Sequence, residues 1–87
     1  MDKKAFDKAR QLNSDIYNVE KDIKDIDTIL AFDKDPQVTI EIKVGGWQRS
    51  FGGKKYNMIE QVKLGLISLR TDLEQELVKL QEEFSKL

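Results

Sequence analysis

The sequence predicts a mainly helical α+β protein built as a long helix, a β-hairpin and a second long helix. Apolar residues recur every three or four positions in its first third, alternate with polar residues in its middle, and return with heptad spacing in its last third. The chain has 87 residues, so we expect one domain over 1–87. We place its elements as helix 2–34, β-hairpin 37–52 and helix 58–86.

The first predicted helix carries an unbroken apolar seam. Its members step alternately by three and four positions, which is the spacing of a helix packed against another helix as in a coiled coil. We expect this helix to end before Pro36, because the residue before a proline is disfavoured in the α conformation. The seam consists of Ala9, Leu12, Ile16, Val19, Ile23, Ile26 and Leu30.

The middle of the chain predicts a β-hairpin. Residues 38–44 alternate strictly between β-branched and polar side chains, the pattern of a half-buried strand with one apolar face. The dipeptide Gly45-Gly46 tolerates the positive φ angles of tight hairpin turns. Residues 47–51 are then the return strand.

The loop length decides which residues share a face of the hairpin. A loop with an even number of residues places Trp47, Arg49 and Phe51 beside the apolar residues of the first strand, whereas an odd loop places polar residues there. Burial of Trp47 and Phe51 favours the even loop. Arg49 then lies beside an apolar face, where it breaks the pattern.

The second predicted helix begins with a capping signal. Asn57 is a suitable N-cap, and Glu60 completes a capping-box-like pair. Three successive leucines, Leu69, Leu73 and Leu77, are spaced by four, a stutter that locally unwinds a left-handed supercoil. The whole apolar stripe consists of Ile59, Val62, Leu66, Leu69, Leu73, Leu77, Leu80, Phe84 and Leu87.

We expect the helices to lie antiparallel, with the hairpin at one end. This arrangement buries one seam, yet further apolar residues widen both stripes, and two strands alone are marginally stable in water. We therefore expect a homo-oligomer, a dimer or higher, through a helical bundle, a sheet completed across a symmetry axis, or both. The additional apolar residues are Tyr17, Ile29, Phe32, Met58, Leu64 and Ile67.

Composition excludes several classes of function. The chain has no Cys and no His, and its net charge of −1 argues against general nucleic-acid binding.

No segment has the length and apolarity of a membrane span or a signal peptide, so we expect a cytoplasmic protein that binds no membrane. No G-x-G-x-x-G or complete phosphate-binding loop occurs, and the acids near Pro36 lack the glycine of a calcium loop. We expect neither an enzyme nor a cofactor or metal site.

Residues 43–56 form the only dense group of candidate binding residues. This segment combines cations and aromatic rings, and residues 37–56 carry four Lys or Arg against one Glu. Such residues suit an anionic, nucleotide-like ligand, because rings stack on bases and Arg binds phosphate. The alternative is structural: turn glycines, core aromatics and solvated lysines. The candidate ligand-binding residues are Lys43, Trp47, Arg49, Lys54, Lys55 and Tyr56.

Two resemblances follow from these elements. The order helix–hairpin–helix with heptad seams resembles a short prefoldin β-type subunit, which implies a chaperone-like protein. The acidic heptad helix, the Gly-containing turn and the final run Glu-Leu-Val-Lys-Leu-Gln-Glu-Glu-Phe resemble small phage accessory proteins. Some of those are oligomers that sequester nucleotide signals of host immunity. We therefore expect a non-enzymatic homo-oligomer that sequesters an anionic small molecule between protomers or, alternatively, a module that binds a host protein.

Overall fold

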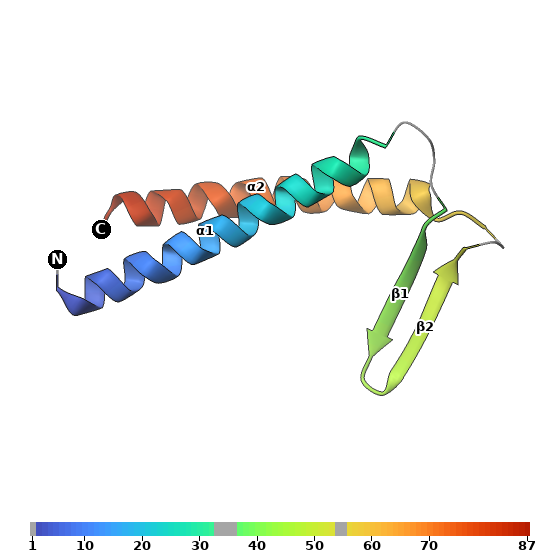
Figure 1. Ribbon diagram of the computed structural model, residues 1–87, viewed down its shortest axis with the longest axis horizontal. Coiled ribbons are helices and arrows are strands. Elements are labelled where there is room, and N and C mark those ends of the chain that lie inside the picture. The colour runs from blue at the N-terminus through green and yellow to red at the C-terminus, as the bar shows by residue number, and fades with distance from the viewer. Residues whose placement is uncertain (1, 33–36, 54–55) are drawn as a thin grey trace.

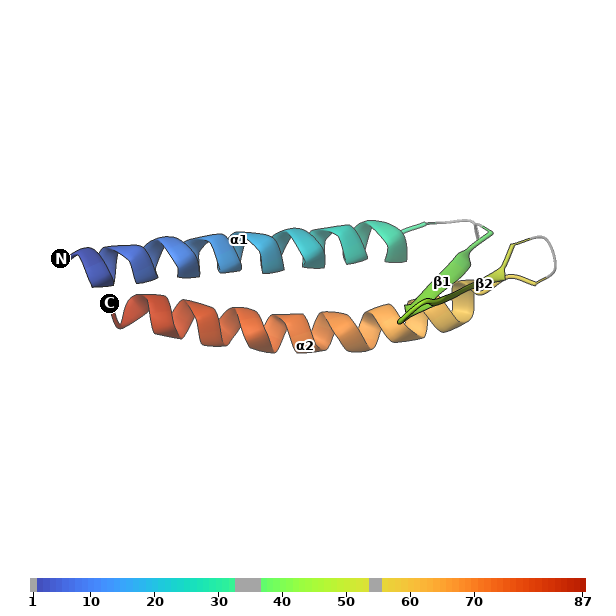
Figure 2. The same ribbon diagram turned by 90° about the horizontal axis from the view of Figure 1, so that it is seen from below.

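The structure, a computed structural model, consists of two long antiparallel helices joined by a β-hairpin. It describes residues 2–32, 37–53 and 56–87. Both termini lie at one end of the helix pair, and the hairpin lies at the other (Figures 1 and 2). The predicted fold class is confirmed.

Helix α1 spans Lys3–Leu30. The carboxylate of Asp2 accepts a hydrogen bond of 2.7 Å from the backbone N–H of Ala5 and thereby caps the first turn. The helix ends before residue 34, where the sequence had placed its end, and Ala31 is its C-cap. The seam stops at Leu30, so a further turn would gain no packing against α2. Residues 33–36 lie outside the described part of the chain.

Strands β1 (Thr39–Val44) and β2 (Trp47–Gly52) form the hairpin. They pair antiparallel with Val44 opposite Trp47, so the loop is the two-residue Gly45-Gly46 and the predicted even register is confirmed. Gly45 has a φ of +58°, which glycine adopts without steric cost at the first position of such a turn. Strand β1 begins one residue later than the predicted residue 38, and β2 begins at residue 47 as predicted.

Helix α2 spans Ile59–Ser85, one residue shorter at each end than predicted. The predicted N-cap is wrong, because Met58 holds the cap position without a side-chain bond. The Asn57 side chain instead accepts two hydrogen bonds of 3.1 Å, from the N–H groups of Val38 and Ile59. Asn57 therefore ties the start of the hairpin to the start of α2.

The core of the single chain lies along the seam between the helices. Every predicted seam residue of α1 is buried or half-buried. On α2 the predicted stripe is wrong at Leu69, which is 46% exposed, because the half-buried Arg70 takes its place. It is also wrong near the C-terminus, where Phe84 and Leu87 are exposed. The most deeply buried residues in the described part of the chain are Leu12, Ile26, Ile59 and Leu80.

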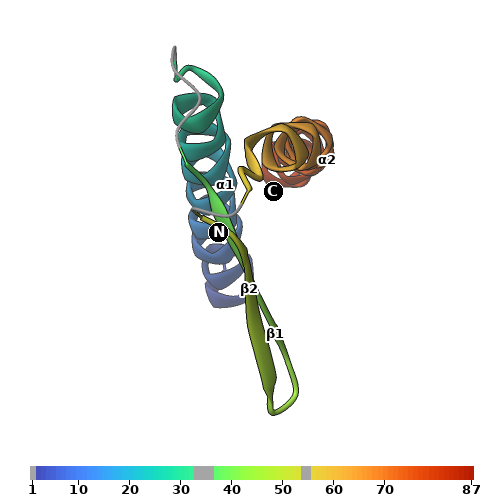
Figure 3. The same ribbon diagram turned by 90° about the vertical axis from the view of Figure 1, so that its right-hand side faces the viewer.

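The hairpin projects sideways from the end of the helix pair rather than covering it (Figures 1 and 3). This arrangement leaves a large surface: the chain exposes 7088 Å². A compact monomer of 10.1 kDa exposes about 5,300 Å² by the general scaling of surface with mass. The chain thus exposes about 1,800 Å² more than a compact protein of its size.

Candidate binding face of the hairpin

The two faces of the hairpin differ in chemistry, because side chains alternate along each strand. The register places Ile42 opposite Arg49 and Val44 opposite Trp47 on one face. We call this face the apolar hairpin face; it comprises Ile40, Ile42, Val44, Trp47, Arg49 and Phe51. The prediction that Arg49 stands among apolar residues follows directly from the confirmed register.

The apolar hairpin face is largely open to solvent. Trp47 is 52% exposed, and Ile42 and Val44 are exposed as well, so only the end near the helices is half-buried. The expectations that the first strand is half-buried and that Trp47 belongs to the core are therefore wrong for the single chain. The hairpin extends away from the helices, and no described element covers its outer half (Figure 1).

Arg49 is held on this face by an aromatic ring. Its guanidinium carbon lies 4.8 Å from the centre of the Phe51 ring, within the range of a cation–π contact. No carboxylate among the described residues forms an ion pair with Arg49. The positive charge is therefore available to an anionic group from outside the chain.

The six predicted site residues do not form one constellation. Lys43 pairs with Gln48 on the opposite, polar face, where Gln48 also donates a hydrogen bond to the carboxylate of Glu41. Lys54 and Lys55 lie outside the described residues, and Tyr56 is an exposed residue between the hairpin and α2. Only Trp47 and Arg49 of the six are thereby placed on one face.

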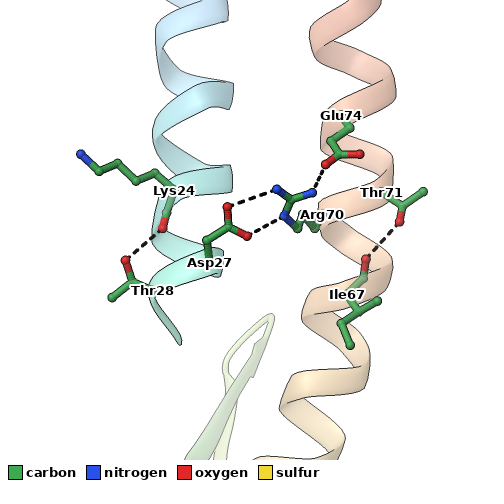
Figure 4. A network of polar contacts seen from close by, with 7 residues as sticks. All are labelled: Lys24, Asp27, Thr28, Ile67, Arg70, Thr71 and Glu74. Carbon is green, nitrogen blue, oxygen red and sulfur yellow. Dashed lines mark hydrogen bonds and ion pairs between the residues drawn. The ribbon is translucent and has the colours of Figure 1, made fainter. Parts of the chain in front are cut away.

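A second polar cluster joins the helices at Arg70 (Figure 4). Arg70 donates two hydrogen bonds to the carboxylate of Asp27, of 2.6 and 3.1 Å, and also pairs with Glu74. The hydrogen bond to Arg70, together with its charge, lowers the pKa of Asp27 below its ordinary value. The sequence does not predict this bond, because a polar residue next to a seam gives no signal of its partner.

No candidate metal site occurs in the described part of the chain. Its residues contain no group of three or more Asp, Glu, His or Cys that could hold a metal ion. No helix in this part of the chain has the length and apolarity to cross a membrane. Two shallow hollows lie on the surface of α1, and neither is lined by hairpin residues.

The fold and this face define a helix–β-hairpin–helix protein with an exposed apolar and cationic face. Comparison with protein families, curated proteins and solved structures gives no match.

Proposed function

We propose that this chain is a non-enzymatic, homo-oligomeric binding module whose apolar hairpin face docks a partner protein. The observation that carries the proposal is that Trp47 and Arg49 share an exposed apolar face. Trp, Tyr and Arg are the residue types that contribute most to binding energy at protein interfaces. The partner we expect offers a carboxylate to Arg49 beside an apolar surface for Trp47.

The amount of exposed surface supports docking. One partner in a standard protein–protein interface loses about 800 Å². The excess of about 1,800 Å² is enough for two such interfaces, one on the hairpin and one on the helices. The prefoldin-like order of elements fits a module of this kind.

Affinity capture with matched variants tests the proposal. We expect a partner captured by the wild-type chain to be lost with Trp47→Ala and with Arg49→Glu. Gln48→Ala, on the opposite face of the same strand, should capture it as well as the wild type. With the purified partner, we expect each of the first two substitutions to weaken binding at least tenfold, as for interface hot spots. Equal capture by all four chains would contradict the proposal.

Sequestration of a nucleotide-like anion at the same face is the second candidate function. The unpaired charge of Arg49 beside the rings of Trp47 and Phe51 favours it. It ranks second because Lys43 lies on the other face of the hairpin, which leaves Arg49 as the only described cation on this one. Calorimetric titration with nucleotides and cyclic nucleotides tests it: binding by the wild type and loss in Arg49→Ala would support it. This is the form that a phage-type, anti-defence role would take.

A further inference from the structure

Helix α2 carries a second apolar stripe besides the one that packs on α1. Leu64, Ile67, Thr71 and Val78 step by three, four and seven positions, so they lie on one side of the helix. Leu64, Ile67 and Val78 are all more than half exposed. Apolar side chains on two faces are typical of a helix that packs against two neighbours.

This second stripe lies on the flank of the helix pair marked by the Asp27–Arg70 pair. Ile67 lies three residues before Arg70, and Thr71 lies four residues after Ile67. In Figure 4 the side chains of Ile67 and Thr71 lie on the side of α2 that is turned away from α1. On α1, Lys24 precedes Asp27 by three residues and Tyr17 precedes Lys24 by seven, which places them on the same flank. We call this surface the ion-pair flank; it comprises Tyr17, Lys24, Asp27, Ala31, Leu64, Ile67, Arg70, Thr71, Glu74 and Val78.

The hairpin does not cover the ion-pair flank. It runs on the far side of the helix pair in the close view of the network (Figure 4). Figure 3 shows the hairpin leaving the pair on one side only. No described element covers the flank, and its length and heptad spacing fit a pair of helices.

The Asp27–Arg70 pair also fixes which residues of the two antiparallel helices lie at the same height. Lys24 lies three residues before Asp27 and Glu74 four after Arg70, so the two stand nearly level. Ala31 and Ile67 stand nearly level by the same reasoning at the hairpin end. These two levels each combine a residue of α1 or its C-cap with a complementary residue of α2: the cation Lys24 with the acid Glu74, and the small Ala31 with the large Ile67.

We propose that a second copy of this chain packs on the ion-pair flank, about a two-fold axis parallel to the helices. This symmetry keeps every residue at its height and places α1 of one protomer against α2 of its partner. Lys24 then meets the partner's Glu74, and Ala31 meets the partner's Ile67. The hollow lined by Tyr17, Glu20, Lys21, Lys24 and Asp25 lies on α1 near the height of Val78 and receives the partner's Val78.

The proposed assembly is a four-helix bundle in which every neighbouring pair of helices is antiparallel. A second copy fits better than an unrelated helix, because the flank carries both halves of each complementary pair, as a two-fold interface requires. The excess exposed area of about 1,800 Å² per chain exceeds the share of about 800 Å² that one partner loses in a standard interface. The proposal does not depend on what the hairpin binds.

Native mass spectrometry and sedimentation of matched variants test the interface. The wild type should have twice the 10.1 kDa mass of the chain. Ile67→Glu should weaken the dimer at least tenfold, because it places a charge in the buried part of the interface. Leu69→Glu is the control: it lies two residues away on the other side of the seam, with 46% exposure against 52% for Ile67. A monomeric wild type, or equal effects of the two substitutions, would overturn the proposal.

Two checks complete this test. Circular dichroism should show that both variants keep their helices, so that a loss of the dimer is not a loss of the fold. Trp47→Ala should leave the dimer intact, which separates this interface from the docking face of the hairpin. Dissociation by Trp47→Ala would instead place the hairpin in the dimer interface and contradict the proposed axis.

Disulfide trapping tests the symmetry, since the chain has no cysteine of its own. A mixture of Ala31→Cys and Ile67→Cys chains should form a covalent heterodimer under mild oxidation, because these positions face each other across the interface. Thr71→Cys alone should not link to itself, because the two α2 helices lie diagonally opposite in the bundle. A self-linked Thr71→Cys dimer without the mixed heterodimer would overturn the axis in favour of α2 packed on α2.

Discussion

Asp27 and Arg70 bind each other across the two helices through two parallel hydrogen bonds, of 2.6 and 3.1 Å. Arg70 lies four residues after Leu66 and three before Leu73, so a charged side chain fills a position of the apolar seam. Its aliphatic stem can pack along the seam while its guanidinium reaches Asp27 and Glu74. The consecutive spacings of four therefore run from Val62 through Leu66 to Arg70, about two turns earlier than the leucines suggest.

The ion pair predicts a pH dependence of stability. Because the pKa of Asp27 is lowered from 3.8 in the folded protein, ionised Asp27 stabilises the fold above that pH. This stabilisation is lost as the pH falls below 3.8 and passes through the lower pKa that Asp27 has in the folded protein. Asp27→Asn should melt at a lower temperature than the wild type at neutral pH, and the difference should shrink below pH 3.8. Thermal melts followed by circular dichroism across this range measure it.

The effect of Asp27→Asn should be small and should weaken in high salt, because both partners are partly exposed to solvent. Asp22→Asn is the matched control on the same helix, since it removes an exposed carboxylate that forms no ion pair with any described residue. A difference between Asp27→Asn and the wild type that stays constant with pH would contradict the role of the pair.

Two glycines should respond oppositely to replacement by alanine. Gly52 has a φ of +106°, and a Cβ there would lie 2.5 Å from the carbonyl oxygen of Val38. Gly52→Ala should therefore lower the free energy of unfolding by about 2 kcal/mol or more. Gly65 lies inside α2 with no atom within 4 Å of an added Cβ, so Gly65→Ala should raise it by about 1 kcal/mol. Urea denaturation measures both changes.

The sequence predicted those parts of the fold that depend on local periodicity. The seam of α1, the order of elements and the hairpin register all follow from repeats of 3.6 or two residues, and all are confirmed. The prediction was wrong at Leu69, because side chains at adjacent positions compete for a seam and only packing decides between them. It was also wrong about burial of Trp47, because alternation shows which residues share a face and not what covers that face.

The candidate site was predictable only in part for the same reason. Trp47 and Arg49 are two positions apart on one strand, so the sequence alone places them together. Lys43 is near them in sequence but on the other face of the hairpin. The bond from Arg70 to Asp27 links residues 43 positions apart, and no local pattern reports such a contact.

The Asn57 side chain should control how firmly the hairpin is attached. Its oxygen accepts hydrogen bonds from the N–H groups of Val38 and Ile59, one on each side of the junction. Asn57→Ala should cost about 1 kcal/mol of stability, as for loss of a helix cap. Hydrogen exchange should show faster exchange of the Val38 and Ile59 amides. Asn13→Ala, at an exposed position inside α1, is the control and should leave both amides unchanged.

Trp47 allows the two proposed surfaces to be separated by fluorescence. It is the only tryptophan in the chain, and it is 52% exposed on the apolar hairpin face. If copies associate through the ion-pair flank, the dilution that separates them should leave its emission maximum unchanged. A partner that docks on the hairpin should shift the emission to shorter wavelengths, because binding removes water from the indole.

The same measurement on the Ile67→Glu chain supplies the control, since this chain should be monomeric at every concentration. Its emission should match that of the wild-type dimer, because Trp47 stays in water in both. A concentration-dependent blue shift in the wild type that is absent from Ile67→Glu would mean that self-association itself covers Trp47. The hairpin face would then belong to the homo-oligomer and would not be free for another protein.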